Sequence, residues 1–296
     1  MIKFLLLAAL VLSCGEDEAR REAPAPDYTK APSADYAVGR GRKEAPAVRF
    51  VDITAAAGID FVHENGARGD KWMPETMGSG CALFDHDGDG DLDLLLVNCR
   101  GWQGAAAAGK LYRNDGGGTF ADITAAAGLD FSVYGMGATI ADYDGDGDPD
   151  IYLTVLGPNL LLRNDGGRYS DVAAVAGVAG ATWRDDAGND SPEWSTGAAW
   201  ADIDGDGWLD LLATNYVRWS PETDIYTSLD GKEKSYATPQ QYPGSTPRLY
   251  RNKGDGTFAE ITAAAGLSLP GGKSMGVAMT DFEGDGLIDL VVTNDT

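Results

Sequence analysis

Short apolar runs flank an acidic, glycine-punctuated loop at four places along the chain. The run before each loop holds small and apolar residues, and the run after it is rich in Leu, Ile and Val. Such runs, bounded by turn-forming residues, are typical of β-strands. We therefore expect each loop to join two antiparallel strands. The paired runs are 80–84 with 94–97, 137–141 with 151–153, 197–201 with 211–213, and 276–280 with 290–292.

Two further patterns recur between the loops. Residues 111–120, 161–169 and 249–258 each read as an apolar run, an Asn/Asp-Gly turn and a second short run, which predicts a hairpin. Residues 52–58 recur at 122–128 and, in varied form, at 260–266. Their Thr suits an N-cap, their alanines favour helix and their Gly suits the position after a helix, so we expect one helical turn there.

Together these patterns give about four short strands and one helical turn per repeat. The loops start at residues 85, 142, 202 and 281, so their spacings are 57, 60 and 79. Four-stranded units at this kind of spacing are typical of β-propeller blades. We predict an all-β propeller with about four blades in this sequence. The extra length before the fourth loop predicts a polar insertion at about 216–247, which we expect to cross a surface of the ring.

The loops have the chemistry of a calcium site. Each carries carboxylates at positions 1, 3, 5 and 9 and Gly at positions 4 and 6, where positive φ lets the backbone wrap round a point. Clustered anions repel one another unless a cation lies among them, and hard oxygen ligands favour Ca²⁺ over zinc or copper. We expect up to four Ca²⁺ ions. The predicted side-chain ligands are Asp85, Asp87, Asp89 and Asp93; Asp142, Asp144, Asp146 and Asp150; Asp202, Asp204, Asp206 and Asp210; and Asp281, Glu283, Asp285 and Asp289. The predicted carbonyl ligands, at position 7, are Asp91, Asp148, Trp208 and Leu287.

Two other readings of the loops compete with this one. An EF-hand also has acids at positions 1, 3 and 5, but it needs a bidentate Glu at position 12 and a helix after it. Position 12 is Leu96, Leu153, Ala213 or Val292, which excludes the EF-hand. Asp-Gly pairs also make metal-free hairpin turns, although a turn needs one such pair rather than four acids at fixed offsets. Glu283 is one methylene longer than Asp, so the fourth loop departs furthest from the pattern.

The repeats resemble a known family. The relevant residues are the Asp loops, Phe-Val-His-Glu-Asn-Gly at 61–66, Pro-Glu-Thr-Met-Gly-Ser-Gly at 74–80, and Leu-Tyr-Arg-Asn followed by Gly-Thr-Phe. They resemble FG-GAP/VCBS calcium-loop propeller repeats and, more closely, the bacterial cartilage-acidic-protein-like (ASPIC/UnbV) family. The resemblance covers about 48–296. It implies a secreted or envelope protein with a propeller followed by a small C-terminal ASPIC/UnbV domain, in a family whose molecular activity is mostly undefined.

The chain departs from that family in two ways. Family members often carry cysteines in the insertion, where this chain has Ala237, so we do not expect that cross-link. The sequence also stops at Thr296 without the C-terminal domain. We expect it to be the N-terminal part of a longer protein with an incomplete ring; the alternative is a short form that closes or oligomerises.

The N-terminus has the pattern of a lipoprotein signal peptide, residues 1–14. A short apolar run, 4–12, leads into Val-Leu-Ser-Cys, which resembles a lipobox ending at Cys14. Residues 15–46 are rich in Pro, Ala and charge, and we expect a disordered tether there, followed by the propeller at 47–296. The alternative is a buried helix start with a chance Cys. This pattern predicts a bacterial envelope protein, lipid-anchored and facing the periplasm or the cell exterior.

Charge and cysteine content limit the partners and the chemistry. The net charge of −23 argues against nucleic acid and anionic lipid as partners. If Asp85 faces Asp93, Cys81 faces Val97 and Cys99 lies diagonally, about 7–8 Å away. That separation favours two buried thiols, although a bulge would permit a disulfide.

The sequence offers few candidates for an active site. Of two histidines, His86 at loop position 2 is expected to be exposed, and His63, near Glu64, Asn65 and Glu75, is expected to be structural rather than catalytic. We assign no catalytic residue, since no nucleophile elbow, phosphate loop, dinucleotide fingerprint or zinc spacing occurs. Trp200 and Trp208 are expected to pack within a blade. Trp183 and Trp194 flank a polar run and are candidates for a sugar-stacking surface.

Three functions fit these features. We expect a binding module for a protein or glycan ligand outside the cytoplasm, and not an enzyme. An enzyme acting on polysaccharide is the first alternative, because some similar calcium propellers belong to lyases or dehydratases, but such chemistry needs a base in a cleft. A structural spacer for a C-terminal domain is the second alternative.

Overall fold

The structure is a computed structural model that describes residues 49–99, 109–129, 131–268, 271–282 and 284–295. The chain divides into two units, one of Met1–Leu5 with Thr54–Thr296 and one of Leu6–Ile53. The predicted signal peptide 1–14 with Cys14, and the predicted tether 15–46, lie outside the described residues. No helix in the described part is both long enough and apolar enough to span a membrane.

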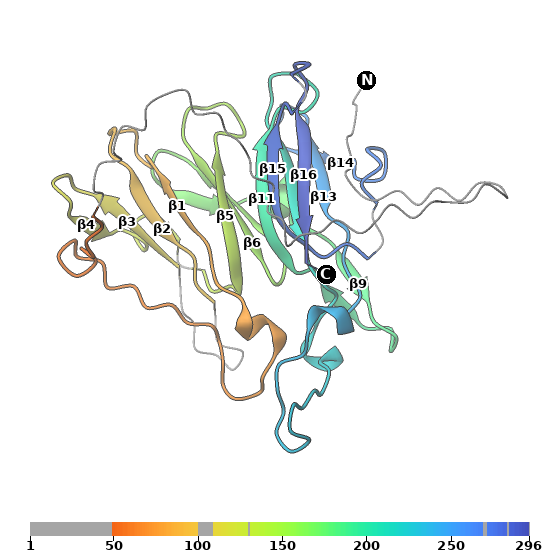
Figure 1. The fold of residues 1–296 in the computed structure, drawn as a ribbon. Helices are drawn as coiled ribbons and strands as arrows, with labels where there is room; N and C mark the ends of the chain where they lie inside the picture. The colour runs from red at the N-terminus through yellow and green to blue at the C-terminus, as the bar shows by residue number, and fades with distance from the viewer. Residues whose placement is uncertain (1–48, 100–108, 130, 269–270, 283, 296) are drawn as a thin grey trace, which may run out of the picture. The chain divides into compact units, whose positions relative to one another are not determined.

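The larger unit is built from antiparallel sheets whose strands follow chain order (Figure 1). The first sheet contains β1 (Cys81–Phe84), β2 (Asp93–Leu96), β3 (Lys110–Asn114) and β4 (Phe120–Asp122). The second contains β5 (Gly135–Ala141), β6 (Asp150–Val155), β7 (Leu160–Asn164) and β8 (Tyr169–Asp171). The third contains β11 (Ser195–Ala201), β12 (Asp210–Asn215), β13 (Arg248–Asn252) and β14 (Phe258–Glu260). Two-stranded sheets pair β9 (Thr182–Arg184) with β10 (Asp190–Pro192), and β15 (Ser274–Thr280) with β16 (Asp289–Asn294).

These sheets confirm the predicted all-β class and the four-stranded blades of FG-GAP type. The acidic loops join β1 to β2, β5 to β6, β11 to β12 and β15 to β16, as expected from the apolar pattern. Within the described residues, the helical elements are a single turn of α-helix and three short 3₁₀ segments. They are η1 (Met73–Thr76), α1 (Ala173–Ala176), η2 (Pro221–Thr223) and η3 (Pro239–Gln241).

Successive repeats meet through their first strands. β1 contacts β5, β5 contacts β11, and β11 contacts β15. Glycine is required at these contacts because the backbones approach closely. A Cβ atom at Gly80 would lie 2.9 Å from Gly137 Cα, and one at Gly197 would lie 3.2 Å from Met275 O. This explains why each first strand begins with small residues.

The apolar core lies between neighbouring sheets. Each repeat therefore buries its apolar side chains against the next repeat. Phe84 and Leu95 of the first sheet pack in one cluster with Ile151 and Leu162 of the second. Another cluster joins the second and third sheets, and a third lies between the third sheet and β15–β16. The interfaces therefore alternate with the sheets along the chain.

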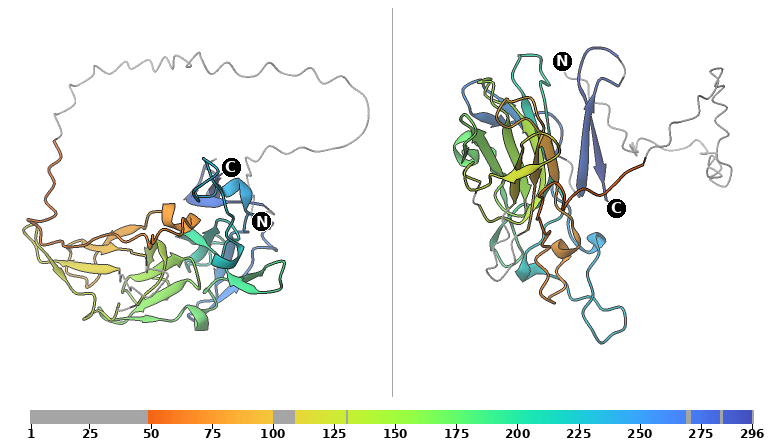
Figure 2. Two further views of the ribbon diagram at one scale, coloured as in Figure 1. Left: turned by 90° about the horizontal axis from the view of Figure 1, so that it is seen from below. Right: turned by 90° about the vertical axis from the view of Figure 1, so that its left-hand side faces the viewer.

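The segment between β12 and β13, residues 216–247, packs into an apolar cluster that it shares with Met73 of η1 and Met136 of β5. Tyr216, Val217 and Trp219 are buried there together with Trp194, and Val217 forms a bridge with Gly244. Figures 1 and 2 show the middle of this segment, in teal to light blue, extending beyond the ends of the neighbouring strands. It contains η2 and η3 but no strand of a described sheet.

The predicted helical turns are only partly correct. Residues 54–58, 124–128 and 262–266 form hydrogen-bonded turns rather than helix. The α-helical turn found among the described residues, α1, lies in the second repeat, outside the three predicted positions. The final Gly of each turn does adopt positive φ, as at Gly58 (+81°). The predicted N-cap role is wrong for Thr124 and Thr262: Thr124 Oγ1 accepts from Leu111 N at 3.0 Å, and Thr262 Oγ1 from Leu249 N at 2.9 Å. Each of these Thr hydroxyls therefore accepts its hydrogen bond from a strand N–H and not from the first turn of a helix.

The expected pairing around the cysteines is shifted by one residue. Phe84, not Asp85, faces Asp93, so Cys81 faces Leu96 rather than Val97. Cys81 is exposed and Cys99 is buried, and both are free. The prediction of two buried thiols is therefore wrong for Cys81. Burial raises the pKa of the Cys99 thiol, which lies 3.1 Å from Ser79 Oγ.

Candidate metal centres

The first Asp of each acidic loop organises the loop backbone. Asp85 Oδ1 accepts from Gly88 N at 2.9 Å and Asp89 N at 3.1 Å, and its Oδ2 accepts from Gly90 N at 2.9 Å. Gly88 and Gly90 have φ of +75° and +92°, as their predicted role in wrapping the loop requires. The same three bonds recur around the first Asp of the other loops, at Asp142, Asp202 and Asp281.

Positions 1, 3 and 5 come together in the three loops whose residues are all described. Carboxylate oxygens of each triad lie within 4.8 Å of one another. The triads are Asp85, Asp87 and Asp89; Asp142, Asp144 and Asp146; and Asp202, Asp204 and Asp206. In the fourth loop Glu283 lies outside the described residues, although Asp281 and Asp285 make the same backbone hydrogen bonds as their counterparts.

The donor set of the triads fits a hard divalent cation. All three donors are carboxylates, which Ca²⁺ prefers. Asp144 Oδ1 is buried and has no hydrogen-bond partner, although a buried polar atom without one costs free energy. Burial, followed by the nearby Asp146 and Asp142, raises the pKa of Asp144. A cation among these oxygens would satisfy the unpaired atom and offset the repulsion.

The Asp at position 9 accepts hydrogen bonds both from its own loop and from the third strand of its own sheet. Asp150 is fully buried; its Oδ2 accepts from Tyr143 N at 3.1 Å and its Oδ1 from Asn164 N at 2.8 Å. Asp93 and Asp210 make the equivalent pairs of bonds. Burial raises the pKa of Asp150 to about 7 and that of Asp210 to about 6. In the first loop, ligand atoms of His86, Asp87 and Asp93 lie within 4.8 Å of one another, so position 9 approaches one residue of its triad. The ligand role of Asp93, Asp150, Asp210 and Asp289 stays a prediction.

The side chain at position 7 points away from the triad and contacts the turn after the third strand of its own sheet. Asp148 Oδ2 accepts from Gly166 N at 2.8 Å, in the turn between β7 and β8. The Trp208 ring packs so closely on the turn after β13 that a Cβ atom at Gly254 would lie 2.7 Å from its Nε1. The proposed use of the backbone carbonyls of Asp91, Asp148, Trp208 and Leu287 is not tested by these contacts and stays a prediction.

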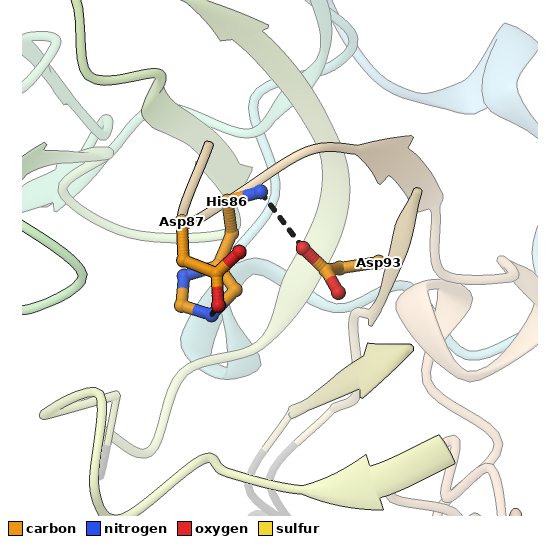
Figure 3. Close-up of side chains that lie close together, drawn as sticks. All are labelled: His86, Asp87 and Asp93. Carbon is orange, nitrogen blue, oxygen red and sulfur yellow. Dashed lines mark hydrogen bonds and ion pairs between the residues drawn. The ribbon is translucent and has the colours of Figure 1, made fainter. Parts of the chain in front are cut away.

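Position 2 faces the next sheet, which the sequence interpretation missed. His86 is 5% exposed, so its predicted exposure is wrong. Its ring lies beside Tyr169, with centroids 6.5 Å apart, and its carbonyl accepts from Asn164 Nδ2 at 3.1 Å. Figure 3 shows the ring against Asp87, with 3.7 Å between Nε2 and Asp87 Oδ2, and the His86 backbone N donating to Asp93.

The same contact recurs one repeat further along. Tyr143 is buried between Trp200 and Phe258 of the third sheet, and its carbonyl accepts from Asn252 Nδ2 at 2.9 Å. Two sequence signals mark this interaction. Position 2 is always large (His, Tyr, Ile or Phe), and an Asn recurs at the end of each third strand.

The remaining candidate residues fall in different places. His63 is exposed and lies 3.2 Å from Ser79 Oγ through its Nε2. Trp200 packs against Phe258 of its own sheet, as expected, and also against Tyr152 of the second sheet. Trp194 is fully buried against Trp219, so its part in a sugar-stacking surface is wrong. Trp183 is half-buried and donates its indole N–H to Pro192 O at 3.0 Å.

Comparison with known proteins agrees with this architecture. The family model described as FG-GAP-like repeat matches residues 79–153 and 230–292. Cartilage acidic protein 1 from Mus musculus is 31% identical over 195 residues, and those from Xenopus tropicalis and Homo sapiens are 30% identical over 191 and 195 residues. Each alignment covers 62% of this chain but 24% of the relative, so the chain spans about a quarter of the relatives it matches.

A solved structure is also similar at low identity. It is an Agrocybe aegerita lectin described as recognising non-reducing terminal N-acetylglucosamine. The similarity covers 73% of this chain and 48% of the lectin chain, with 20% identity and a TM-score of 0.37, which is too distant to argue from. The chain thus contains FG-GAP-like repeats, and over part of its length it resembles cartilage acidic protein 1.

Proposed function

We propose that this protein is a calcium-stabilised binding module that presents its loops to a protein or glycan outside the cytoplasm. The observation that carries the proposal is the repeated carboxylate triad with its unpaired Asp144 oxygen. Calcium bound by Asp85, Asp87 and Asp89, and by the equivalent residues of the other loops, would supply positive charge where these anions meet. The loops would then serve as rigid corners between strands.

Calcium binding of this kind couples directly to stability. A cation that binds the folded chain and not the unfolded one stabilises the fold by ~2.7 kcal/mol per site at ~100 times its dissociation constant. In the second repeat the triad is joined to the sheet interface through Tyr143, the residue after Asp142. Loss of the cation is therefore expected to loosen the contact between sheets as well as the loop.

We propose binding rather than catalysis because the acid–base candidates are poorly placed for it. A general base works in a cleft within reach of substrate. His86 is buried at a sheet interface and His63 lies apart from the triads on a different segment. The proposed location outside the cytoplasm, with a lipid on Cys14, rests on the N-terminal sequence pattern and on the family resemblance.

A thermal melt of the purified full chain, with millimolar Ca²⁺ or with EDTA, tests the calcium role. We expect EDTA to lower the Tm, and we expect Asp144→Ala and Asp87→Ala each to reduce the size of that shift. Glu222→Ala is the matched control, because Glu222 is an exposed acid outside the loops. Identical melting curves in Ca²⁺ and EDTA would contradict the proposal.

Incubation with a glycan panel separates binding from catalysis. A binding module is expected to retain a glycan without producing new reducing ends or unsaturated sugars. Release of such products by the full chain would favour the polysaccharide-active enzyme instead.

A further inference from the structure

Arg218 lies where three cavities adjoin, between the β9–β10 hairpin, the 216–247 segment and the start of β13. The cavities have volumes of about 300, 190 and 510 Å³, and Arg218 lines all three. Trp183 and Arg184 line the first two. The first is lined by polar groups in addition, among them Ser245 and Arg248. These cavities are separate from the acidic triads, which belong to the loops between first and second strands.

The charges in the 300 Å³ cavity do not cancel. Arg248 pairs with Glu193 through two bonds, Nη2 to Oε1 at 2.7 Å and Nε to Oε2 at 3.2 Å. Arg184 pairs with Asp190 in the same forked manner. In the described part of the chain, the exposed Arg218 guanidinium makes no hydrogen bond or ion pair. The cavity therefore keeps one uncompensated positive charge in a chain whose net charge is −23.

The Glu193–Arg248 pair forms a fixed wall of this cavity rather than a competing ligand. Glu193 is buried, and its Oε2 also accepts from Ala181 N at 3.1 Å and Asn215 Nδ2 at 3.3 Å. Its carboxylate is thus fully engaged. The 190 Å³ cavity is less suited to an anion because Asp185 and Asp186 line it. The described residues that line the 510 Å³ cavity include no aromatic side chain. An anionic ligand that also needs an aromatic surface therefore fits the 300 Å³ cavity, which Arg218 and Trp183 both line.

Trp183 adds an oriented aromatic surface to the positive charge. Its indole N–H donates to Pro192 O at 3.0 Å, which orients the ring, and the side chain is half-buried rather than covered completely. An aromatic ring anchored at its polar end offers a flat apolar face. A guanidinium offers a planar fork of donors that matches a carboxylate. A sugar ring bearing a carboxylate combines the two complementary features.

We propose that this cavity binds a uronic acid residue of an acidic polysaccharide, with the carboxylate on Arg218 and the sugar ring against Trp183. The proposal rests on the binding function proposed above and names its ligand class. The hydroxyl of Thr182, which also lines the cavity, can bond to a sugar hydroxyl.

Isothermal titration of the full chain in Ca²⁺ with a galacturonate trisaccharide tests the proposal. Its methyl ester is the neutral control, and a sulfated trisaccharide is the second anion. We expect the acid to bind about tenfold more tightly than the ester, the scale of one charge-assisted pair. Arg218→Ala should abolish that difference, Arg218→Lys should keep part of it, and Trp183→Ala should weaken acid and ester alike. Arg251→Ala removes the same charge from an exposed position on β13 and should change nothing.

The outcomes separate this inference from the proposed function. Equal binding of acid and ester, preference for the sulfated sugar alone, or an equal loss in Arg218→Ala and Arg251→Ala would each overturn it. If the chain binds a neutral glycan or a protein but not the uronate, the binding function stands and the uronate site does not. A chain that binds none of these ligands fails both.

Discussion

The second acidic loop, residues 142–150, and the fourth, residues 281–289, share a backbone arrangement but not an environment. Asp142 and Asp281 each accept three backbone N–H groups from positions 4, 5 and 6. Position 2 differs: Tyr143 is 2% exposed between sheets, whereas Phe282 is 74% exposed. The nine residues of each loop thus determine its backbone conformation by themselves. The burial of the side chain at position 2 depends instead on contacts with a neighbouring sheet.

The pKa shifts of the loop carboxylates also separate local effects from effects of burial. Backbone hydrogen bonds lower the pKa of the exposed Asp281. Burial raises the pKa of Asp150 to about 7, because desolvation outweighs the two N–H groups that it accepts. Local hydrogen bonding and burial therefore shift the pKa of carboxylates in these two loops in opposite directions, and substitutions can separate the two effects.

The largest contrast is expected at position 2. Tyr143→Ala removes a buried ring from the interface of the second and third sheets and should cost ~3–5 kcal/mol of unfolding free energy. Phe282→Ala removes an exposed ring and should cost less than ~0.5 kcal/mol. Urea unfolding in Ca²⁺ measures both. Similar costs would mean that the two loops do not differ as their burial indicates.

A smaller contrast is expected at position 9. Asp150→Ala leaves Tyr143 N and Asn164 N without their acceptor, at ~1–3 kcal/mol each if both stay buried. Asp289→Ala affects Phe282 N, so its cost should be about half as large. Unfolding in EDTA excludes any metal contribution from both values. If Asp289→Ala lowered the unfolding free energy more than Asp150→Ala does, the number of accepted N–H groups would not explain the cost.

The smallest contrast concerns the Gly at position 4. Gly145 and Gly284 have φ of +76° and +75°, so replacement by Ala should cost ~1–2 kcal/mol of backbone strain in both. A Cβ atom at Gly145 also meets Trp208 Cζ3 at 3.2 Å, whereas no other described residue would lie within 4 Å of one at Gly284. We expect Gly145→Ala to lower the Tm more than Gly284→Ala. Equal shifts in calorimetry would indicate that Trp208 moves aside without cost.

The sequence predicted those features that are determined locally. The strands either side of each acidic loop follow from their apolar runs, and the loop conformation follows from Asp at position 1 and Gly at positions 4 and 6. The hairpins at the Asn/Asp-Gly turns were predicted for the same reason. In each case the residues that determine the structure lie within about ten positions of one another.

The features that were missed depend on distant segments. His86 is buried by Tyr169 and Asn164 of the next sheet, and Trp194 by Trp219 beyond another strand pair. Thr124 bonds to Leu111 of a neighbouring strand instead of capping a helix. No periodicity within one repeat identifies such partners. The carboxylate triads were found because their chemistry repeats in four loops, whereas the Arg218 cavity occurs once.

The central claim is that the acidic loops hold divalent cations, and counting bound calcium tests it most directly. Equilibrium dialysis of the metal-free chain against millimolar Ca²⁺ is expected to give about one ion per acidic loop, and one fewer for Asp144→Ala. A chain that retains no calcium under these conditions would contradict the account.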